Sequence, residues 1–208
     1  KIWGKWYLFT KKTGQQLLGV RKVGKYRYLY AGKDGSRQFG LKKYSGSTYL
    51  LDKKKGIMQT GFQFLRTGTQ TGRLAYFTKS AGKMLLGQHK IGRTRYTFDK
   101  YNGNLTAIGK KKVAASDSSN AYLNKVKVHG KWYVFDDQGQ VQTYFQNITD
   151  NQIVYGSKVL GYLLTGFRHI KLQADNKWHY YYFDKKTGLM FTGFKNLSAG
   201  RRVYFSQN

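Results

Sequence analysis

The sequence has no cysteine and no glutamate among its 208 residues, and its nine acidic residues are all aspartate. Without cysteine the chain forms neither disulfide bonds nor thiolate metal sites. Without glutamate it offers little material for the paired carboxylates that sugar-cleaving enzymes need. No apolar run is long enough to span a membrane as a helix, and no secretory leader pattern is recognisable.

Other signs of catalysis are also missing. There is neither a Gly-x-Ser-x-Gly nucleophile motif nor a Gly-rich phosphate loop. Four aspartates share one position directly after an aromatic residue, which predicts turn capping and not catalysis. They are Asp52, Asp99, Asp136 and Asp184. The four histidines show no metal-ligand spacing. We therefore predict a chain that is not an enzyme and has no metal or cofactor.

Positive charge is in large excess. Lysine and arginine total 38 against the nine aspartates, which gives a formal net charge of +29. A field of this strength attracts polyanions and is screened by salt. The alternative is a surface that only aids solubility, but such surfaces usually mix both signs. We therefore expect an anionic polymer or an anionic surface as the partner.

A short repeat runs along the chain. An aromatic or apolar position is followed by a polar tip, by a Gly four or five residues later, and in most copies by a second Gly five residues beyond. The first position is held by Phe9, Tyr30, Leu51, Phe77, Phe98, Phe135, Phe183 and Phe205. The turn glycines are Gly14, Gly35, Gly56, Gly82, Gly103, Gly139 and Gly188. Units this small cannot bury an apolar face alone and must stack on their neighbours.

Each copy has the pattern of a β-hairpin. A tyrosine often lies two residues before the aromatic position, which places both rings on one face of a strand. The turn Gly suits a positive φ angle. A short apolar strand is expected after it, as at Ile57–Met58, Lys83–Met84, Asn104–Leu105 and Leu189–Met190. We predict an all-β solenoid of stacked β-hairpin repeats of about 21 residues, with no long helix.

The cleanest copy spans Tyr180–Phe194 and reads YYYFDKKTGLMFTGF. It resembles the cell-wall-binding repeat of choline-binding proteins and glucan-binding domains in Gram-positive surface proteins, as do Trp132–Gly139 and Trp6–Phe9. The resemblance implies stacked hairpins with ligands held between neighbours. We expect a first array over residues 1–108, an irregular insertion or linker over 109–128, and a second array over 129–208. The chain begins within a copy, so we expect it to be a piece of a longer protein.

Two sets of side chains are candidates for binding. Lysines at the tips would form a basic stripe when copies stack. These are Lys11, Lys12, Lys53, Lys54, Lys55, Lys79, Lys100, Lys185 and Lys186. Most rings in the repeat positions should be core, including Phe9, Phe98, Phe135, Phe183 and Phe205. Other rings could point outward and stack on a sugar or hold a quaternary ammonium group. These are Trp6, Tyr76, Trp132, Trp178, Tyr182 and Tyr204.

In the choline-binding branch, the resemblance implies a Trp at the end of the Gly-Trp step. Here that step ends in Phe62, Phe167 and Phe194, so we expect no regular row of choline cages.

Three functions remain open. The first is a non-catalytic cell-surface module that binds an anionic wall polymer such as teichoic or lipoteichoic acid. The second is a glucan-binding domain for neutral α-glucan, which leaves the charge of +29 unexplained. The third is an adhesin for host mucin or other anionic glycans. Each implies a secreted chain at the bacterial cell surface, and binding to nucleic acid would be non-specific.

Overall fold

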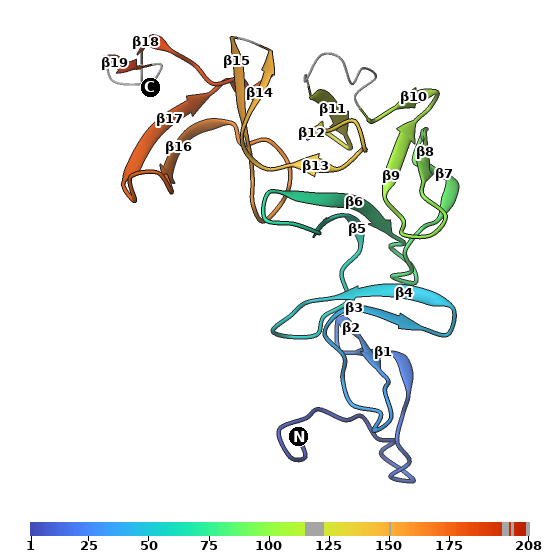
Figure 1. The fold of residues 1–208 in the computed structure, drawn as a ribbon. Helices are drawn as coiled ribbons and strands as arrows, with labels where there is room; N and C mark the ends of the chain where they lie inside the picture. The colour runs from blue at the N-terminus through green and yellow to red at the C-terminus, as the bar shows by residue number, and fades with distance from the viewer. Residues whose placement is uncertain (115–122, 150, 197–199, 201, 207–208) are drawn as a thin grey trace. The chain divides into compact units, whose positions relative to one another are not determined.

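The computed structural model describes residues 1–208 except 115–122, 150, 197–199, 201 and 207–208. The described residues form antiparallel strands and contain no α-helix (Figure 1). The strands are β1 (Gly19–Val23), β2 (Tyr26–Tyr30), β3 (Gly40–Tyr44), β4 (Ser47–Leu51), β5 (Gly61–Arg66), β6 (Thr71–Phe77), β7 (Gly87–Ile91), β8 (Thr94–Phe98), β9 (Leu105–Ile108), β10 (Lys111–Lys112), β11 (Asn124–Val128), β12 (Lys131–Phe135), β13 (Val141–Gln142), β14 (Tyr144–Thr149), β15 (Gln152–Gly156), β16 (Gly166–Lys171), β17 (Trp178–Phe183), β18 (Gly193–Asn196) and β19 (Arg202–Phe205).

Most strands pair only with their neighbour along the chain. Five hairpins stand as two-stranded sheets: β1–β2, β3–β4, β14–β15, β16–β17 and β18–β19. The others join into a four-stranded sheet β10-β9-β8-β7 and a five-stranded sheet β11-β12-β13-β6-β5. This arrangement confirms the predicted all-β fold of repeated hairpins.

The main hairpin of each copy lies before the aromatic position and not after it. In β3–β4, for example, the connecting residues Ser45 and Gly46 both have positive φ, 46° and 72°. Such two-residue turns match the twist of the paired strands. The apolar residues expected to form a strand after the turn Gly mostly form single bridges, such as Leu51 with Met58 and Phe183 with Met190. The exception is Leu105, which begins β9.

The polar tips follow the predicted turn chemistry. The turn glycines have φ angles between 67° and 73°. In the four predicted copies the Asp side chain caps the tip. Asp52 Oδ1 accepts the N–H of Lys54, Asp99 Oδ1 that of Tyr101, and Asp136 Oδ1 that of Gln138. Asp184 Oδ1 accepts two backbone N–H groups and the Thr187 hydroxyl. These contacts confirm that the recurring Asp stabilises the turn.

In several copies, the residue two positions after the Gly of the tip links three copies. Met58 donates its backbone N–H to Arg27 O in the copy before, at 2.9 Å. Its side chain lies against Gly82 in the copy after, so that a Cβ at Gly82 would be 2.7 Å from Met58 Cγ. Met84 repeats this with Thr48 O and Gly103, and Leu163 repeats it with Trp132 O and Gly188. Stacking is therefore built from contacts between neighbouring copies.

The described residues cluster into two compact units. The first contains residues 1–63, 75–89 and 98–103, and the second contains 64–74, 90–97 and 104–208. The expected arrays 1–108 and 129–208 remain a prediction. Part of the expected linker, residues 115–122, lies outside the described residues; Lys111–Lys112 and Asn124–Val128 on either side of it form strands.

Each unit has its own hydrophobic core. One cluster in the first unit contains Leu29, Ala31, Tyr49, Leu51 and Met58. The second unit has a cluster of Val134, Ile148, Val154 and Leu163 and another centred on Phe183. Burial of such apolar surface drives the stacking.

The repeat positions are buried with one exception. Phe98, Phe135, Phe183 and Phe205 are at most 6% exposed, which confirms them as core. The prediction for Phe9 is wrong, since its side chain is 43% exposed. Residues 1–18 form only single bridges, and the Tyr7 ring lies 6.4 Å from the Phe9 ring. Too little surface covers Phe9 to bury it.

Candidate functional site

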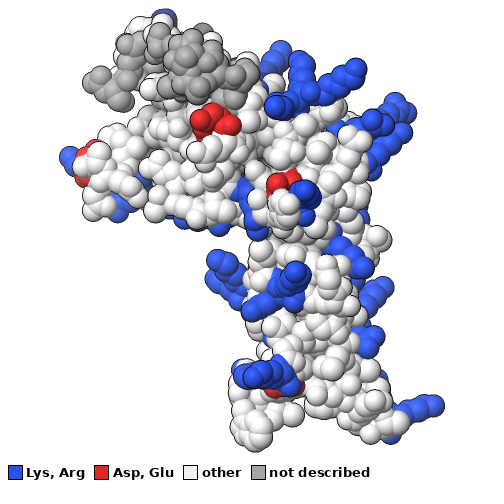
Figure 2. All heavy atoms as spheres, turned by 45° about the vertical axis from the view of Figure 1, so that its right-hand side comes forward, with Lys and Arg blue, Asp and Glu red and all other residues white. Residues whose placement is uncertain are grey.

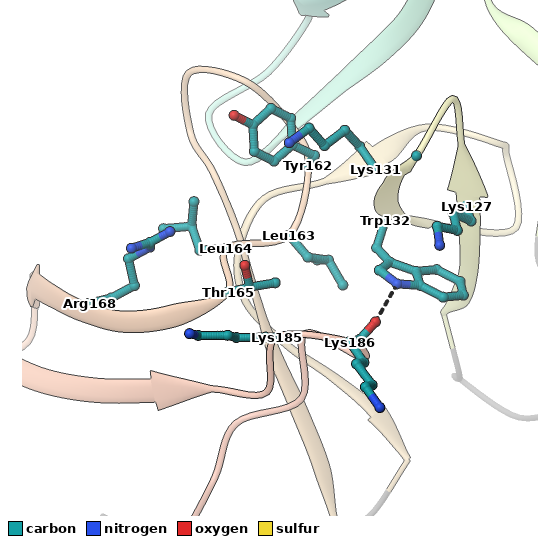
Figure 3. Close-up of a pocket in the computed structure, with 11 residues that line it drawn as sticks. Lys127, Lys131, Trp132, Tyr162, Leu163, Leu164, Thr165, Arg168, Lys185 and Lys186 are labelled. Atoms are coloured by element: carbon teal, nitrogen blue, oxygen red, sulfur yellow. Dashed lines mark hydrogen bonds between the residues drawn. The ribbon is translucent and has the colours of Figure 1, made fainter. Parts of the chain in front are cut away.

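Three predicted site residues meet in a groove of the second unit. Trp132 lies on β12, and Lys185 and Lys186 form the tip after β17. The groove encloses about 550 Å³ and is shown in Figure 3. Its lining residues are Lys127, Gly130, Lys131, Trp132, Tyr162, Leu163, Leu164, Thr165, Arg168, Lys185 and Lys186. We call it the basic groove, because five of these side chains are cationic and none is acidic.

Hydrogen bonds fix the tip against the strand. Trp132 Nε1 donates to Lys186 O at 2.8 Å, the bond drawn in Figure 3. Lys125 Nζ donates to Thr187 O at 3.0 Å. Both bonds hold the backbone of the tip and leave the Lys185 and Lys186 ammonium groups exposed.

Cations and rings are interleaved in the groove. Lys127 Nζ lies 5.6 Å from the Trp132 ring centroid, and Lys131 Nζ lies 4.9 Å from that of Tyr162. Outside the lining, Lys125 Nζ is 5.1 Å from Trp132, and burial lowers the pKa of Lys125. The ring faces thus attract the protein's own ammonium groups, which remain available to an anion.

One acidic residue, Asp184, lies beside the groove and interacts electrostatically with Lys186. Hydrogen bonds from Thr187 hold the pKa of the Asp184 carboxyl below its usual range. That carboxylate therefore stays ionised at neutral pH, and its Oδ1 accepts the N–H groups of Lys186 and Thr187 and the Thr187 hydroxyl. A phosphate or sulfate entering the groove would meet five cations. The lysines act as point charges, and Arg168 can donate two hydrogen bonds in a bidentate contact.

The remaining predicted lysines are exposed on their own tips. They are Lys11, Lys12, Lys53, Lys54, Lys55, Lys79 and Lys100. Lys and Arg side chains project at many points of the surface in Figure 2, with Asp visible at few. Their alignment into one stripe stays a prediction.

The predicted outward rings differ in their surroundings. Trp178 and Tyr204 are 58% and 61% exposed, and Trp6 is 46% exposed. Tyr182 is half-buried, with Lys195 Nζ 4.0 Å from its ring centroid. Tyr76 does not point outward: it is 8% exposed and packs edge-on against Phe62 at 4.9 Å. The prediction for Tyr76 is wrong because Phe62, from the adjoining strand β5, covers it.

A second, smaller cavity lies in the same unit between β17 and β19. It encloses about 280 Å³, and no Lys or Arg is among its described lining residues. The lining is His179, Tyr180, Tyr181, Met190, Phe191, Val203, Tyr204, Phe205 and Ser206. We call it the aromatic cavity. Lys195 does not line it, although its Nζ is 5.0 Å from the Phe191 ring centroid.

Sequence reasoning missed most of the basic groove. Lys131 directly follows the two-residue turn His129–Gly130, in which both residues have positive φ, and Lys127 pairs with Trp132 across the same hairpin. That turn could have been recognised as a hairpin that brings Lys127 beside Trp132. Tyr162 and Arg168 belong to a copy that keeps little of the repeat pattern. Their approach to Lys185 depends on stacking between copies.

Comparisons with known proteins give likenesses of fold. No protein-family model matches the chain, and no curated protein matches its sequence. Among solved structures, CbpJ from Streptococcus pneumoniae is 21% identical with a TM-score of 0.41, covering 95% of this chain and 61% of CbpJ. Choline-binding protein F of the same species is 26% identical with a TM-score of 0.41, covering 77% of this chain and 44% of that protein.

The choline-binding domain of Spr1274, also from Streptococcus pneumoniae, is 25% identical with a TM-score of 0.32; the match covers 44% of this chain and 96% of that domain. Choline-binding protein F and the Spr1274 domain carry the name of the choline-binding family that the sequence resembles. This chain spans about half the length of CbpJ and choline-binding protein F. At TM-scores below 0.5 these likenesses do not establish a shared site. Among the described residues, none forms a helix long and apolar enough to cross a membrane.

Proposed function

We propose that this chain is a non-catalytic module that binds an anionic cell-wall polymer, teichoic or lipoteichoic acid, at the bacterial surface. The observation that carries the proposal is the basic groove, with five cations beside the rings of Trp132 and Tyr162. Phosphates of the polymer would pair with the cations, and glycosyl or glycerol parts would contact the rings. The expected consequence is binding that weakens as salt rises.

Repetition would strengthen such binding. One exposed ion pair contributes only about 0–1 kcal/mol. A polymer that reaches several basic tips converts later contacts into intramolecular ones, which raises the overall affinity without new chemistry. The exposed lysines outside the basic groove supply these further contacts in the proposal.

The aromatic cavity supports a second ligand group. Its rings and the absence of Lys or Arg from its described lining suit a quaternary ammonium or a neutral sugar better than a phosphate. Two solved structures that the chain resembles are named as choline-binding proteins. A teichoic acid that carries choline has both chemical groups, so one polymer would use both sites.

The test is binding to purified lipoteichoic acid and to dextran across a salt series. We expect salt-sensitive binding to lipoteichoic acid and little binding to dextran. Salt-insensitive binding to dextran would overturn the proposal in favour of a neutral glucan-binding domain. Binding to sialylated or sulfated mucin in preference to lipoteichoic acid would favour the adhesin.

A pair of double variants tests the groove itself. Lys131→Ala with Lys185→Ala removes two groove cations, and Lys53→Ala with Lys55→Ala removes the same charge from an exposed tip of the other unit. We expect the groove variant to lose at least about tenfold in affinity, and the tip variant to lose less. Equal losses would show that total charge, and not the basic groove, determines binding.

The size distribution of the polymer before and after incubation tests the non-catalytic part of the proposal. An unchanged distribution is expected, and shortening of the polymer would contradict it.

A further inference from the structure

An aromatic cage in the first unit is filled by a side chain of the protein itself. The Arg37 guanidinium carbon lies 5.0 Å from the Trp6 ring centroid, 4.1 Å from that of Tyr28 and 5.8 Å from that of Tyr30. All three distances are within the range of a cation–π contact. Trp6 precedes the first hairpin and the two tyrosines lie on β2, so the rings come from neighbouring copies.

The backbone fixes Arg37 in this position. Its N–H donates to Trp6 O at 2.7 Å, and its backbone forms a bridge with Tyr30. Its stem lies against Gly56, where a Cβ would be 2.9 Å from Arg37 Cδ. The guanidinium then donates to Tyr30 Oη at 3.3 Å and to Lys55 O at 3.5 Å, whereas its buried Nε has no hydrogen-bond partner among the described residues. A buried donor without a partner is costly, and the ring faces around the guanidinium offer it a favourable contact instead.

The repeat shows what this position holds elsewhere. Arg37 is the second residue after a turn Gly, and the same position is Met58, Met84 and Met190 in other copies. Methionine fills the packing role of the stem, as Met58 does against Gly82, without carrying a charge. The charge of Arg37 is thus a feature of this copy and not a requirement of stacking.

We propose that Arg37 blocks a latent site for quaternary ammonium ligands and is the residue that decides its specificity. Three rings around one cation form the kind of cage that recognises choline-like groups. With Arg37 inside, an entering cation would meet both a filled space and a like charge. The proposal concerns the first unit and does not depend on the basic groove.

The test uses tetramethylammonium chloride as the probe, with wild type, Arg37→Met and Arg37→Ala. The readout is the NMR signal of the Trp6 indole N–H, assigned by its loss in Trp6→Ala. This signal reports the cage and not the aromatic cavity. We expect saturable shifts in an Arg37 variant at a concentration at least about tenfold below any response of wild type. Arg93→Met, which removes an equal charge from an exposed turn, is the control and should behave as wild type.

The outcomes separate clearly. Binding by Arg37→Ala alone still supports the proposal, because the methionine would then fill the cage itself. Absence of binding in both variants, with wild-type circular dichroism, overturns it, as does equal binding by wild type. If neither variant folds, the NMR signal of the Arg37 Nε–H group in the wild-type protein is measured instead. Ring currents from the cage should shift this signal upfield. A signal at the position of a free arginine would refute the filled cage.

Discussion

Replacing Gly82 by alanine tests the contact between copies directly. Gly82 has a φ of 70°, and an added Cβ would lie 2.7 Å from Met58 Cγ and closer still to its Sδ. Gly87 has a nearly equal φ of 73°, but its Cβ would meet nothing within 4 Å. The two substitutions therefore share the backbone strain and differ in the clash with Met58.

The magnitudes follow from these two terms. A left-handed conformation destabilises the folded state by about 1–2 kcal/mol when the residue is alanine. Alanine also lowers the conformational entropy of the unfolded chain, which stabilises the folded state by about 0.4–1 kcal/mol. Gly87→Ala should thus lower the free energy of unfolding by about 1 kcal/mol. Overpacking adds about 1–3 kcal/mol, so Gly82→Ala should lower it by about 3 kcal/mol. Met58 has little room to move because it is 7% exposed and its N–H is bound to Arg27 O.

Urea denaturation followed by circular dichroism measures both free energies. Combining each substitution with Met58→Ala completes a double-mutant cycle. We expect the cost of Gly82→Ala to fall by more than about 1 kcal/mol when Met58 is truncated, and the cost of Gly87→Ala to stay the same. Equal costs for the two glycines, or a cycle without coupling, would refute the role of this contact in stacking.

Three further predictions concern single side chains. Burial raises the pKa of Tyr133 to about 12, so Tyr133→Phe should remove a component with that midpoint from the alkaline absorbance titration; loss of a component near 10 would contradict this. Hydrogen bonds from Thr187 lower the folded-state pKa of Asp184, so its stabilisation is present above the unfolded pKa of about 3.9 and is lost as pH falls through the folded value. Asp184→Asn should thus melt at a lower temperature than wild type at pH 7, with a gap that narrows below about pH 4; a gap independent of pH would argue against the charge. Trp132→Phe loses the bond to Lys186 O and should cost about 1 kcal/mol in urea denaturation and weaken lipoteichoic acid binding, whereas unchanged binding would show that the tip needs no such support.

Local features of the fold could be predicted from the sequence because they depend on few residues. A positive φ at Gly56 and a capping Asp52 follow from the turn alone, and the common face of Tyr133 and Phe135 follows from a spacing of two. Their rings are 6.3 Å apart.

Contacts between copies could not be predicted in the same way. Tyr76 and Phe9 occupy positions with similar local patterns to their counterparts, yet Phe62 covers one and little covers the other. In the basic groove, only Lys185, Lys186 and Trp132 were predicted. Arg168 and Tyr162 belong to a copy that keeps little of the repeat pattern. Their proximity to the tip with Lys185 and Lys186 depends on how one hairpin stacks on the next.

Met58, Met84 and Leu163 each contact both the copy before and the copy after their own. This has a consequence for how a repeat chain can gain or lose whole copies. Each of these three residues binds a backbone carbonyl in the copy before it and packs against a bare Gly in the copy after it. Those two features recur in other copies, so removing or duplicating a whole copy would leave matching ends on both sides of the junction. Recombination at the repeat boundary could therefore add or subtract ligand contacts in whole steps, while a cut within a copy would break a hairpin.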